Sequence, residues 1–169
     1  MNRIAYRFML AGAVTAGAAA PAAAGTVEMT VNIPQLRVAE YHRPYVAIWI
    51  EEAGKPEIRT LAVWYDYDNR ENGGTKWLRD LRSWWRKGGR TAAKPADAVT
   101  GATRAPGPQR VKLNTPALKP GNYALVVEAS REEGGRELVS MPFTWNGRSA
   151  TASGTGRTEL GAISATIKP

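Results

Sequence analysis

The chain has 169 residues, a formal net charge of +8 and no cysteine. The lack of cysteine excludes a disulfide scaffold, and this length predicts one domain with a sizeable hydrophobic core. The basic balance is compatible with phosphate-bearing ligands or anionic membrane surfaces. No nucleic-acid-binding module is visible, so we expect no nucleic-acid partner.

The N-terminus has the organisation of a secretory signal peptide. Arg3 and Arg7 give a basic start, and an apolar, Ala-rich stretch follows that ends in three alanines typical of a cleavage site. The apolar stretch is too short to span a bilayer comfortably as an anchor. We therefore expect residues 1–24 to be removed, which lowers the net charge by two. One domain, residues 25–169, would remain in the periplasm of a Gram-negative bacterium or, less readily, be secreted.

Three strands are predicted in the first half of the chain. Residues 25–33 alternate strictly between apolar and polar side chains, which is the pattern of a half-buried strand. Residues 45–51 are a run of β-branched and aromatic residues, and residues 58–65 return after a turn. The two segments predict a hairpin that carries Trp49 and Trp64.

One amphipathic helix is predicted at residues 75–87, with Thr75 as its N-cap. The apolar stripe consists of Trp77, Leu78, Leu81, Trp84 and Trp85. The residues expected to face away are Lys76, Arg79, Arg82, Arg86 and Lys87. Gly88 and Gly89 should end the helix, and the basic residues near its C-terminus favour the helix dipole.

The second half of the chain predicts further strands around a long loop. Residues 91–108 are rich in Pro and Gly, so regular structure is not expected there. Strands are predicted at 109–113, 124–130, 136–145 and 158–167, with a Gly/Ser/Thr loop at 151–157 and a possible break at Gly161.

The pattern Leu118-Lys-Pro-Gly-Asn-Tyr123 is typical of the tyrosine corner of Greek-key sandwiches. Together with the short strands and the single helix, it predicts a mainly β protein. The expected fold is an immunoglobulin-like antiparallel β-sandwich with one inserted amphipathic helix and a long motif-bearing loop. A closed barrel is the alternative.

The motif in this loop is Asp97-Ala-Val-Thr-Gly-Ala-Thr103. Gly101 and Ala102 keep the chain uncrowded, whereas Asp97 and Thr100 can hydrogen-bond the local backbone and hold a turn. The hydroxyl of Thr103 has no activating base within this stretch, so a second enzyme would have to activate it. The motif would otherwise be a plain polar turn.

The motif resembles the acceptor sequence of covalently flavinylated bacterial proteins, in which an acidic residue and two variable residues precede Ser/Thr-Gly-Ala-Thr. The resemblance implies that a magnesium-dependent flavin transferase moves FMN from FAD onto the hydroxyl of Thr103, leaving a phosphoester. Asp97, Thr100, Gly101 and Ala102 would form the recognition sequence. Arg104 and Arg110 are candidates to bind the FMN phosphate, or they are solvated loop charges.

Three other features of the sequence bear on function. The tryptophans of the helix could stack on a flavin, although docking the helix on the sheet explains them better. His42 is the only histidine, and without cysteine or a recognisable carboxylate cluster it predicts no metal or haem site. The oxygen-rich loop from Asp66 to Asn72 does not have EF-hand spacing, so it is interpreted as a solvated turn.

The chain as a whole resembles a family of predicted periplasmic proteins catalogued only as a domain of unknown function. The resembling segments are 43–50, 60–65, 97–107 and 123–128, followed by Arg131-Glu132. Members tend to be encoded beside PepSY-type membrane proteins and flavin transferases. The resemblance implies a periplasmic electron carrier, not an enzyme, with a flavin transferase and a membrane redox protein of PepSY type as partners. The alternative is a cofactor-free sandwich that binds a protein or small ligand; no constellation supports a hydrolase.

Overall fold

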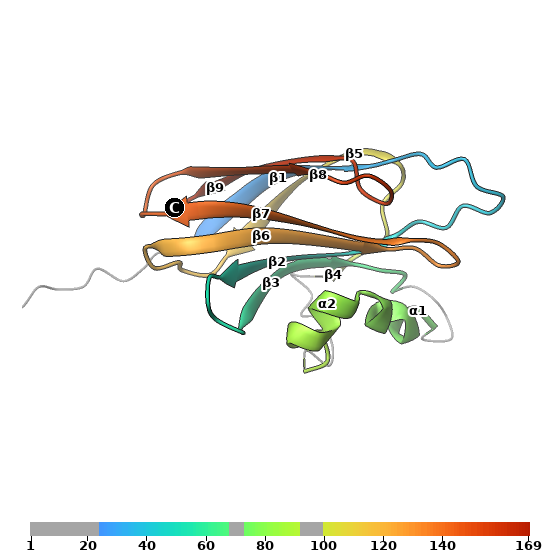
Figure 1. The fold of residues 1–169 in the computed structure, drawn as a ribbon, viewed down its shortest axis with the longest axis horizontal. Coiled ribbons are helices and arrows are strands. Elements are labelled where there is room, and N and C mark those ends of the chain that lie inside the picture. Colours follow the sequence, from blue (N-terminus) through green and yellow to red (C-terminus); the bar gives the residue numbers. More distant parts are fainter. Residues whose placement is uncertain (1–23, 68–72, 92–99) are drawn as a thin grey trace, which may run out of the picture.

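Two β-sheets face each other, and a helical layer covers the outer face of one of them (Figure 1). The computed structural model describes residues 24–67, 73–91 and 100–169. The predicted signal segment lies outside these residues except for Ala24, and so does Asp97 of the motif. The observed β-sandwich confirms the predicted fold class and replaces the barrel alternative.

The first sheet has four antiparallel strands in the order β5-β1-β9-β8. Their bounds are Gly107–Thr115 for β5, Gly25–Ile33 for β1, Ala162–Lys168 for β9 and Ala150–Thr155 for β8. The predicted strand 25–33 is confirmed, because its alternate residues are buried along the whole length. Its outward residues remain partly exposed, as expected for a sheet with one solvated face.

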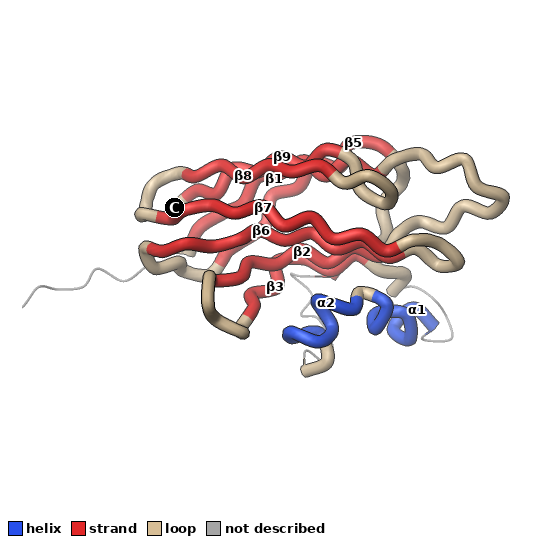
Figure 2. Tube along the Cα trace, in the orientation of Figure 1, coloured by secondary structure: helices blue, strands red, loops and turns tan. Residues whose placement is uncertain are grey.

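The second sheet has the order β4-β3-β2-β6-β7 (Figure 2). The bounds are Thr100–Gly101 for β4, Ile58–Trp64 for β3, Tyr45–Glu52 for β2, Gly121–Ser130 for β6 and Arg136–Trp145 for β7. All neighbours pair antiparallel except β3 and β4, which are parallel. The predicted hairpin of β2 and β3 is confirmed, with a register shift between Ile48 and Trp49.

The main core lies between the two sheets. Residues from both inner faces fill it, among them Val27, Ile48, Leu125, Met141 and Ile167. At its end the predicted tyrosine corner is confirmed, because the hydroxyl of Tyr123 donates to the carbonyl oxygen of Lys119 at 2.8 Å.

The helical layer consists of four short helical segments instead of one continuous helix. They are α1 at Gly73–Lys76, η1 at Trp77–Asp80, α2 at Arg82–Trp84 and η2 at Trp85–Gly89. The helical conformation is interrupted at Leu81, whose ψ of 68° is not helical. The prediction of one helix starting at a Thr75 cap is therefore wrong, since Thr75 lies inside α1.

The break changes which side chains are buried. Leu78, Leu81 and Trp84 are buried, because the 3-10 segment η1 and the break at Leu81 turn these three side chains toward the sheet. They form a second core with Trp49, Val63, Val126 and other residues on the outer face of the five-stranded sheet. Trp77, assigned by its sequence position to the apolar stripe, is instead 42% exposed. The predicted basic face is confirmed, since all five of its residues are exposed.

Glu128 explains the break in the helix. It is fully buried on β6, and its carboxylate accepts hydrogen bonds from the backbone N–H groups of Ser83 at 3.0 Å and Trp84 at 2.8 Å. These are N–H groups of the first turn of α2, which have no partner within the helix. Arg136 donates to the same carboxylate at 2.6 Å and to the hydroxyl of Ser83 at 2.7 Å. The buried charge is therefore compensated by a cation and by a helix start.

Two other predictions need correction. The expected loop at 151–157 is mostly strand β8, and the expected strand at 158–167 begins only at Ala162. Strand β8 was missed because small residues such as Gly154 give no strand pattern in the sequence. The fold leaves no room for a larger residue there, because a Cβ at Gly154 would lie 2.7 Å from Val139. The expected loop at 91–108 also contains β4 and the start of β5.

The turn from β8 to β9 is held by Glu137 of β7. Its carboxylate accepts backbone hydrogen bonds from residues 157, 158, 159 and 160 at 2.6 to 3.0 Å. Burial alone would raise the pKa of Glu137, but the N–H groups outweigh it and lower the pKa below the usual value. The same turn contains Glu159, which is buried and pairs with Arg131.

Replacing Glu128 by Gln should destabilise the fold by about 3 kcal/mol, because it leaves Arg136 and the start of α2 without their anion. Urea denaturation at neutral pH measures the effect. Glu52→Gln is the matched control, since Glu52 makes a partly exposed ion pair with Lys55 and its loss should cost less than about 1 kcal/mol. Equal effects of the two substitutions would contradict this role of Glu128.

Glu137 should contribute a pH-dependent share of stability. Because its folded pKa is lowered, this share is fully present above the unfolded pKa and is lost as the pH falls through the folded pKa. The difference in urea midpoint between the wild type and Glu137→Gln should therefore be large at pH 7 and shrink as the pH is lowered below about 4. A difference that does not change with pH would refute the argument.

Candidate functional site

The motif crosses from one sheet to the other at one side of the sandwich. Thr100 and Gly101 form β4, which pairs with Val63 and Trp64 of β3, and the N–H of Tyr65 donates to the carbonyl oxygen of Gly101 at 2.9 Å. Residues 102–106 then lead to β5. Since β4 and β5 are each the edge strand of their sheet, the motif segment connects the two edges.

Thr103 lies in the middle of this connection. It is partly exposed and follows the exposed Ala102, and no other described residue hydrogen-bonds to its hydroxyl. The segment is fixed on its far side by Gln109, whose side-chain amide donates to the carbonyl oxygen of Ala105 at 2.9 Å. Gly107 has a φ of +113°, a conformation that favours glycine. The hydroxyl is thus available on a short segment that is anchored at both ends.

Arg104 packs on the indole of Trp64. Its guanidinium carbon lies 5.2 Å from the ring centroid, the arrangement of a cation–π contact. Trp64 is only 2% exposed, so Arg104 covers the open side of the main core. The Nε of Arg104 is buried and has no hydrogen-bond partner among the described residues. An unsatisfied buried donor costs free energy, so this arginine is poorly explained by stability alone.

Gly101 makes this contact possible. A Cβ at this position would lie 3.3 Å from Cδ1 of Trp64 and 3.7 Å from Nη2 of Arg104. A side chain here would press on the indole, whereas its distance from the guanidinium is an ordinary van der Waals contact. The glycine of the motif therefore favours close packing on Trp64, in addition to any recognition by another enzyme.

A row of tyrosines lies on the other face of β3. Tyr65, whose N–H bonds Gly101, makes edge contacts with Tyr45 at 6.2 Å and with Tyr67 at 6.3 Å between ring centroids. Burial raises the pKa of Tyr45 to about 12, whereas Tyr67 is 55% exposed. The motif is therefore bordered by an indole on one face of β3 and by phenol rings on the other.

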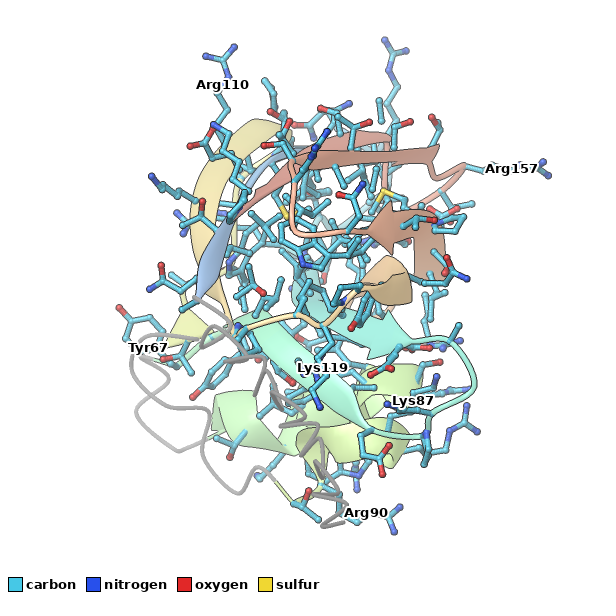
Figure 3. All side chains as sticks on the ribbon, turned by 90° about the vertical axis from the view of Figure 1, so that its left-hand side faces the viewer. Tyr67, Lys87, Arg90, Arg110, Lys119 and Arg157 are labelled. Carbon is cyan, nitrogen blue, oxygen red and sulfur yellow. The ribbon has the colours of Figure 1, made fainter. Side chains whose placement is uncertain are left out.

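The other predicted residues lie elsewhere. Arg110 is on β5 opposite Thr30, and it projects from the outer face of the four-stranded sheet (Figure 3). Of the two arginines considered for a phosphate, only Arg104 is thus shown packed against the motif. Trp84 is fully buried and Trp85 partly buried in the helical layer, and His42 lies in the connection between β1 and β2. Residues 68–72 of the polar loop and Asp97 lie outside the described part.

The residues around the motif could not be found from the sequence. Trp64 and Tyr65 lie more than thirty positions before Thr103, and only the parallel pairing of β3 with β4 brings them together. Parallel pairs between distant segments leave no local signature.

A second surface is a shallow depression of about 660 Å³ on the outer face of the four-stranded sheet. Hydroxyl groups line it from three strands, with Arg110 and Lys112 at one side; the hydroxyls belong to Thr30, Thr151, Ser153, Ser164 and Thr166. Within the described residues it contains no buried polar group that lacks a partner, in contrast to the motif.

Comparison with known families gives one match. The model of the family described as "Predicted periplasmic protein (DUF2271)" covers residues 26–162. The chain belongs to this family. The family description agrees with the periplasmic location that the N-terminus predicts. No curated protein and no solved structure matches the chain significantly. In the part of the chain that the structure describes, no helix has the length and apolar character needed to cross a membrane.

Replacing Arg104 by Met tests whether this arginine is structural. Methionine keeps an unbranched apolar side chain that can still pack beside Trp64, while removing the guanidinium and with it a buried donor without a partner. The free energy of unfolding should stay within about 1 kcal/mol of the wild type or increase. Arg110→Met is the exposed control, and a much larger loss for Arg104→Met would show that the arginine is needed for folding.

Proposed function

We propose that this periplasmic protein carries FMN on Thr103 and transfers electrons. The observation that supports it best is the surrounding of Thr103. Thr103 has a partly exposed hydroxyl without a partner among the described residues, and the next residue in the chain is an arginine whose buried Nε is unsatisfied.

The residues present fit a phosphoester at this position. A phosphodiester keeps one negative charge and offers oxygen acceptors, and arginine is the residue best suited to bind it. Arg104 is the direct neighbour of Thr103 in the chain, and its Nε has an unused donor. The contact with Trp64 holds the guanidinium in place before any ligand is attached.

The attachment would be carried out by a separate flavin transferase. The oxygen of the Thr103 hydroxyl bonds to the phosphorus of the FMN half of FAD, the phosphoanhydride bond breaks, AMP leaves, and the hydroxyl proton is released. No base or metal ligand lies within the motif itself, so activation of the hydroxyl belongs to the transferase. Asp97, Thr100, Gly101 and Ala102 would be the residues that the transferase recognises.

The attached flavin would supply the redox chemistry, whereas the protein positions it and limits its contact with water. The described residues offer aromatic surface for this on the exposed Tyr67. The basic outer face of the helical layer, where Arg90 projects (Figure 3), would favour approach to an anionic membrane surface. A membrane redox protein of PepSY type is the partner expected there.

The intact mass of the mature protein, co-expressed with a flavin transferase, tests the proposal. We expect a gain of one FMN less one water, loss of that gain in Thr103→Ala, and its retention in Thr103→Ser. Thr151→Ala is the control, because Thr151 is exposed on β8, outside the motif. The modified protein should also be yellow.

An unmodified wild-type mass, with a transferase that is active on a known acceptor, would refute the proposal. The cofactor-free alternative would then gain support, and the hydroxyl-lined depression of the four-stranded sheet would be the first surface to test for ligands.

A further inference from the structure

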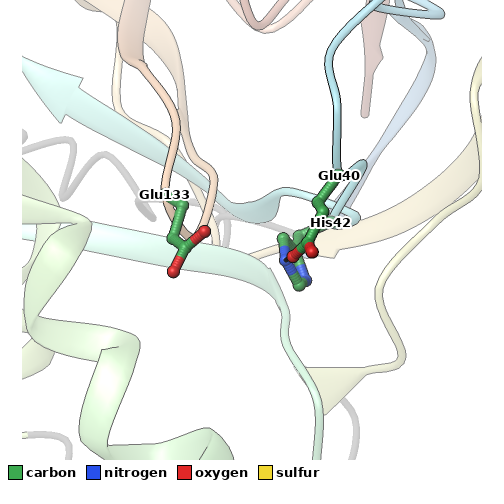
Figure 4. Close-up of side chains that lie close together, drawn as sticks. All are labelled: Glu40, His42 and Glu133. Atoms are coloured by element: carbon green, nitrogen blue, oxygen red, sulfur yellow. Dashed lines mark ion pairs between the residues drawn. The ribbon is translucent and has the colours of Figure 1, made fainter.

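His42 is surrounded by glutamates from two separate segments. Glu40 and His42 lie between β1 and β2, whereas Glu132 and Glu133 lie in the turn between β6 and β7 (Figure 4 shows three of the four). The Nε2 of His42 is 3.8 Å from a carboxylate oxygen of Glu40, and its Nδ1 is 3.8 Å from one of Glu132. Ligand atoms of Glu40, His42 and Glu133 all lie within 4.8 Å of one another.

The turn that carries two of these glutamates is held firmly. The N–H of Arg131 donates to the carbonyl oxygen of Gly135 at 3.0 Å, and that of Gly134 donates back to Arg131 at 3.0 Å. The side chain of Arg131 makes two hydrogen bonds to Glu159, at 3.0 and 3.1 Å, and Glu159 also accepts from the N–H of Gly135. This ion pair is almost completely buried. The positions of Glu132 and Glu133 are therefore set by the fold.

The opposite segment carries Tyr41 between Glu40 and His42. The hydroxyl of Tyr41 is buried and has no hydrogen-bond partner among the described residues, so this side chain of the segment turns toward the protein interior.

The cluster has an excess of negative charge. Three carboxylates surround one imidazole, and among the described residues no lysine or arginine forms an ion pair with Glu40, Glu132 or Glu133. The nearby Arg131 is occupied by Glu159. Even a protonated imidazole would balance only one of these charges, so the arrangement favours a bound cation.

We propose that His42, Glu40 and Glu133 bind a divalent transition-metal ion. The Nε2 of His42, which faces Glu40, is the ligand nitrogen. The Nδ1, which faces Glu132, would donate to that carboxylate, the arrangement in which an outer glutamate orients a metal-binding histidine.

The donor set selects the kind of metal. One imidazole nitrogen with carboxylate oxygens suits zinc and similar ions, whereas calcium and magnesium prefer oxygen ligands alone. The side chains of Glu40 and His42 are 77% and 38% exposed, so water can complete the coordination. The site is thus open on its outer side, as in sites that keep an exchangeable position. It is independent of the proposed flavin.

Zinc titration of the mature, untagged protein tests the site. The chain has a single histidine, so its imidazole Hε1 signal in a proton NMR spectrum reports on the site directly. We expect one zinc ion per chain by calorimetry, with a shift of this signal that saturates at the same ratio. Calcium in the same concentration range should leave the signal unchanged.

Variants separate the site from non-specific binding. His42→Ala and the double substitution Glu40→Gln with Glu133→Gln should each abolish the stoichiometric binding, and Glu132→Gln should weaken it about 10-fold. Glu57→Gln is the matched control, an exposed glutamate in the β2–β3 turn, and should bind as the wild type does. Thermal unfolding confirms that each variant is folded.

Two results would overturn the proposal. One is the absence of stoichiometric zinc binding in the folded wild type, and the other is equal binding by the wild type and the folded double variant. Thr103→Ala should bind zinc normally, so a failure of the flavin proposal would leave this test intact.

Discussion

Besides the apolar contacts of the second core, the helical layer is attached to the sandwich by a buried charge, the carboxylate of Glu128. It caps the first turn of α2 and pairs with Arg136, so it joins the helix, β6 and β7 at one point. The layer that it holds covers the outer faces of β2 and β3 with a second core. With both faces buried, β3 offers only its edge to the rest of the chain. That edge is where the motif strand β4 pairs, so the position of Thr103 depends indirectly on Glu128.

The motif also solves a structural problem of the sandwich. Open strand edges invite pairing with other chains, and proteins commonly cover them. Here β4 pairs with the edge of β3 at Val63 and Trp64, and Arg104 packs on Trp64, so the motif covers the end of this edge. A group attached to Thr103 would therefore be carried by a segment that belongs to both sheets. Such anchoring gives a tethered cofactor a defined position, which a free loop would not.

The parts of the fold that sequence predicted are those coded by local pattern. Strict alternation located β1 to the residue, and the spacing from Leu118 to Tyr123 located the tyrosine corner. The failures have non-local causes. The helix breaks at Leu81 because a glutamate more than forty residues away accepts the N–H groups of the following turn. Strand β8 is built of small residues because the side chains of β7 occupy the space beside it, which periodicity cannot show.

The two candidate sites show that local sequence pattern has the same limit when it is used to predict functional residues. Thr103 could be singled out from the sequence because its motif is continuous, but the contact of Arg104 with Trp64 depends on pairing between distant strands. The glutamates around His42 come from two connections about ninety residues apart, so an isolated histidine in the sequence becomes one of a cluster in the fold. In both places the informative feature is a polar group that the fold leaves uncompensated. The unsatisfied Nε of Arg104 favours a bound anion, and the carboxylates at His42 favour a bound cation. Because neither imbalance contributes to stability, each is better explained by a ligand than by folding.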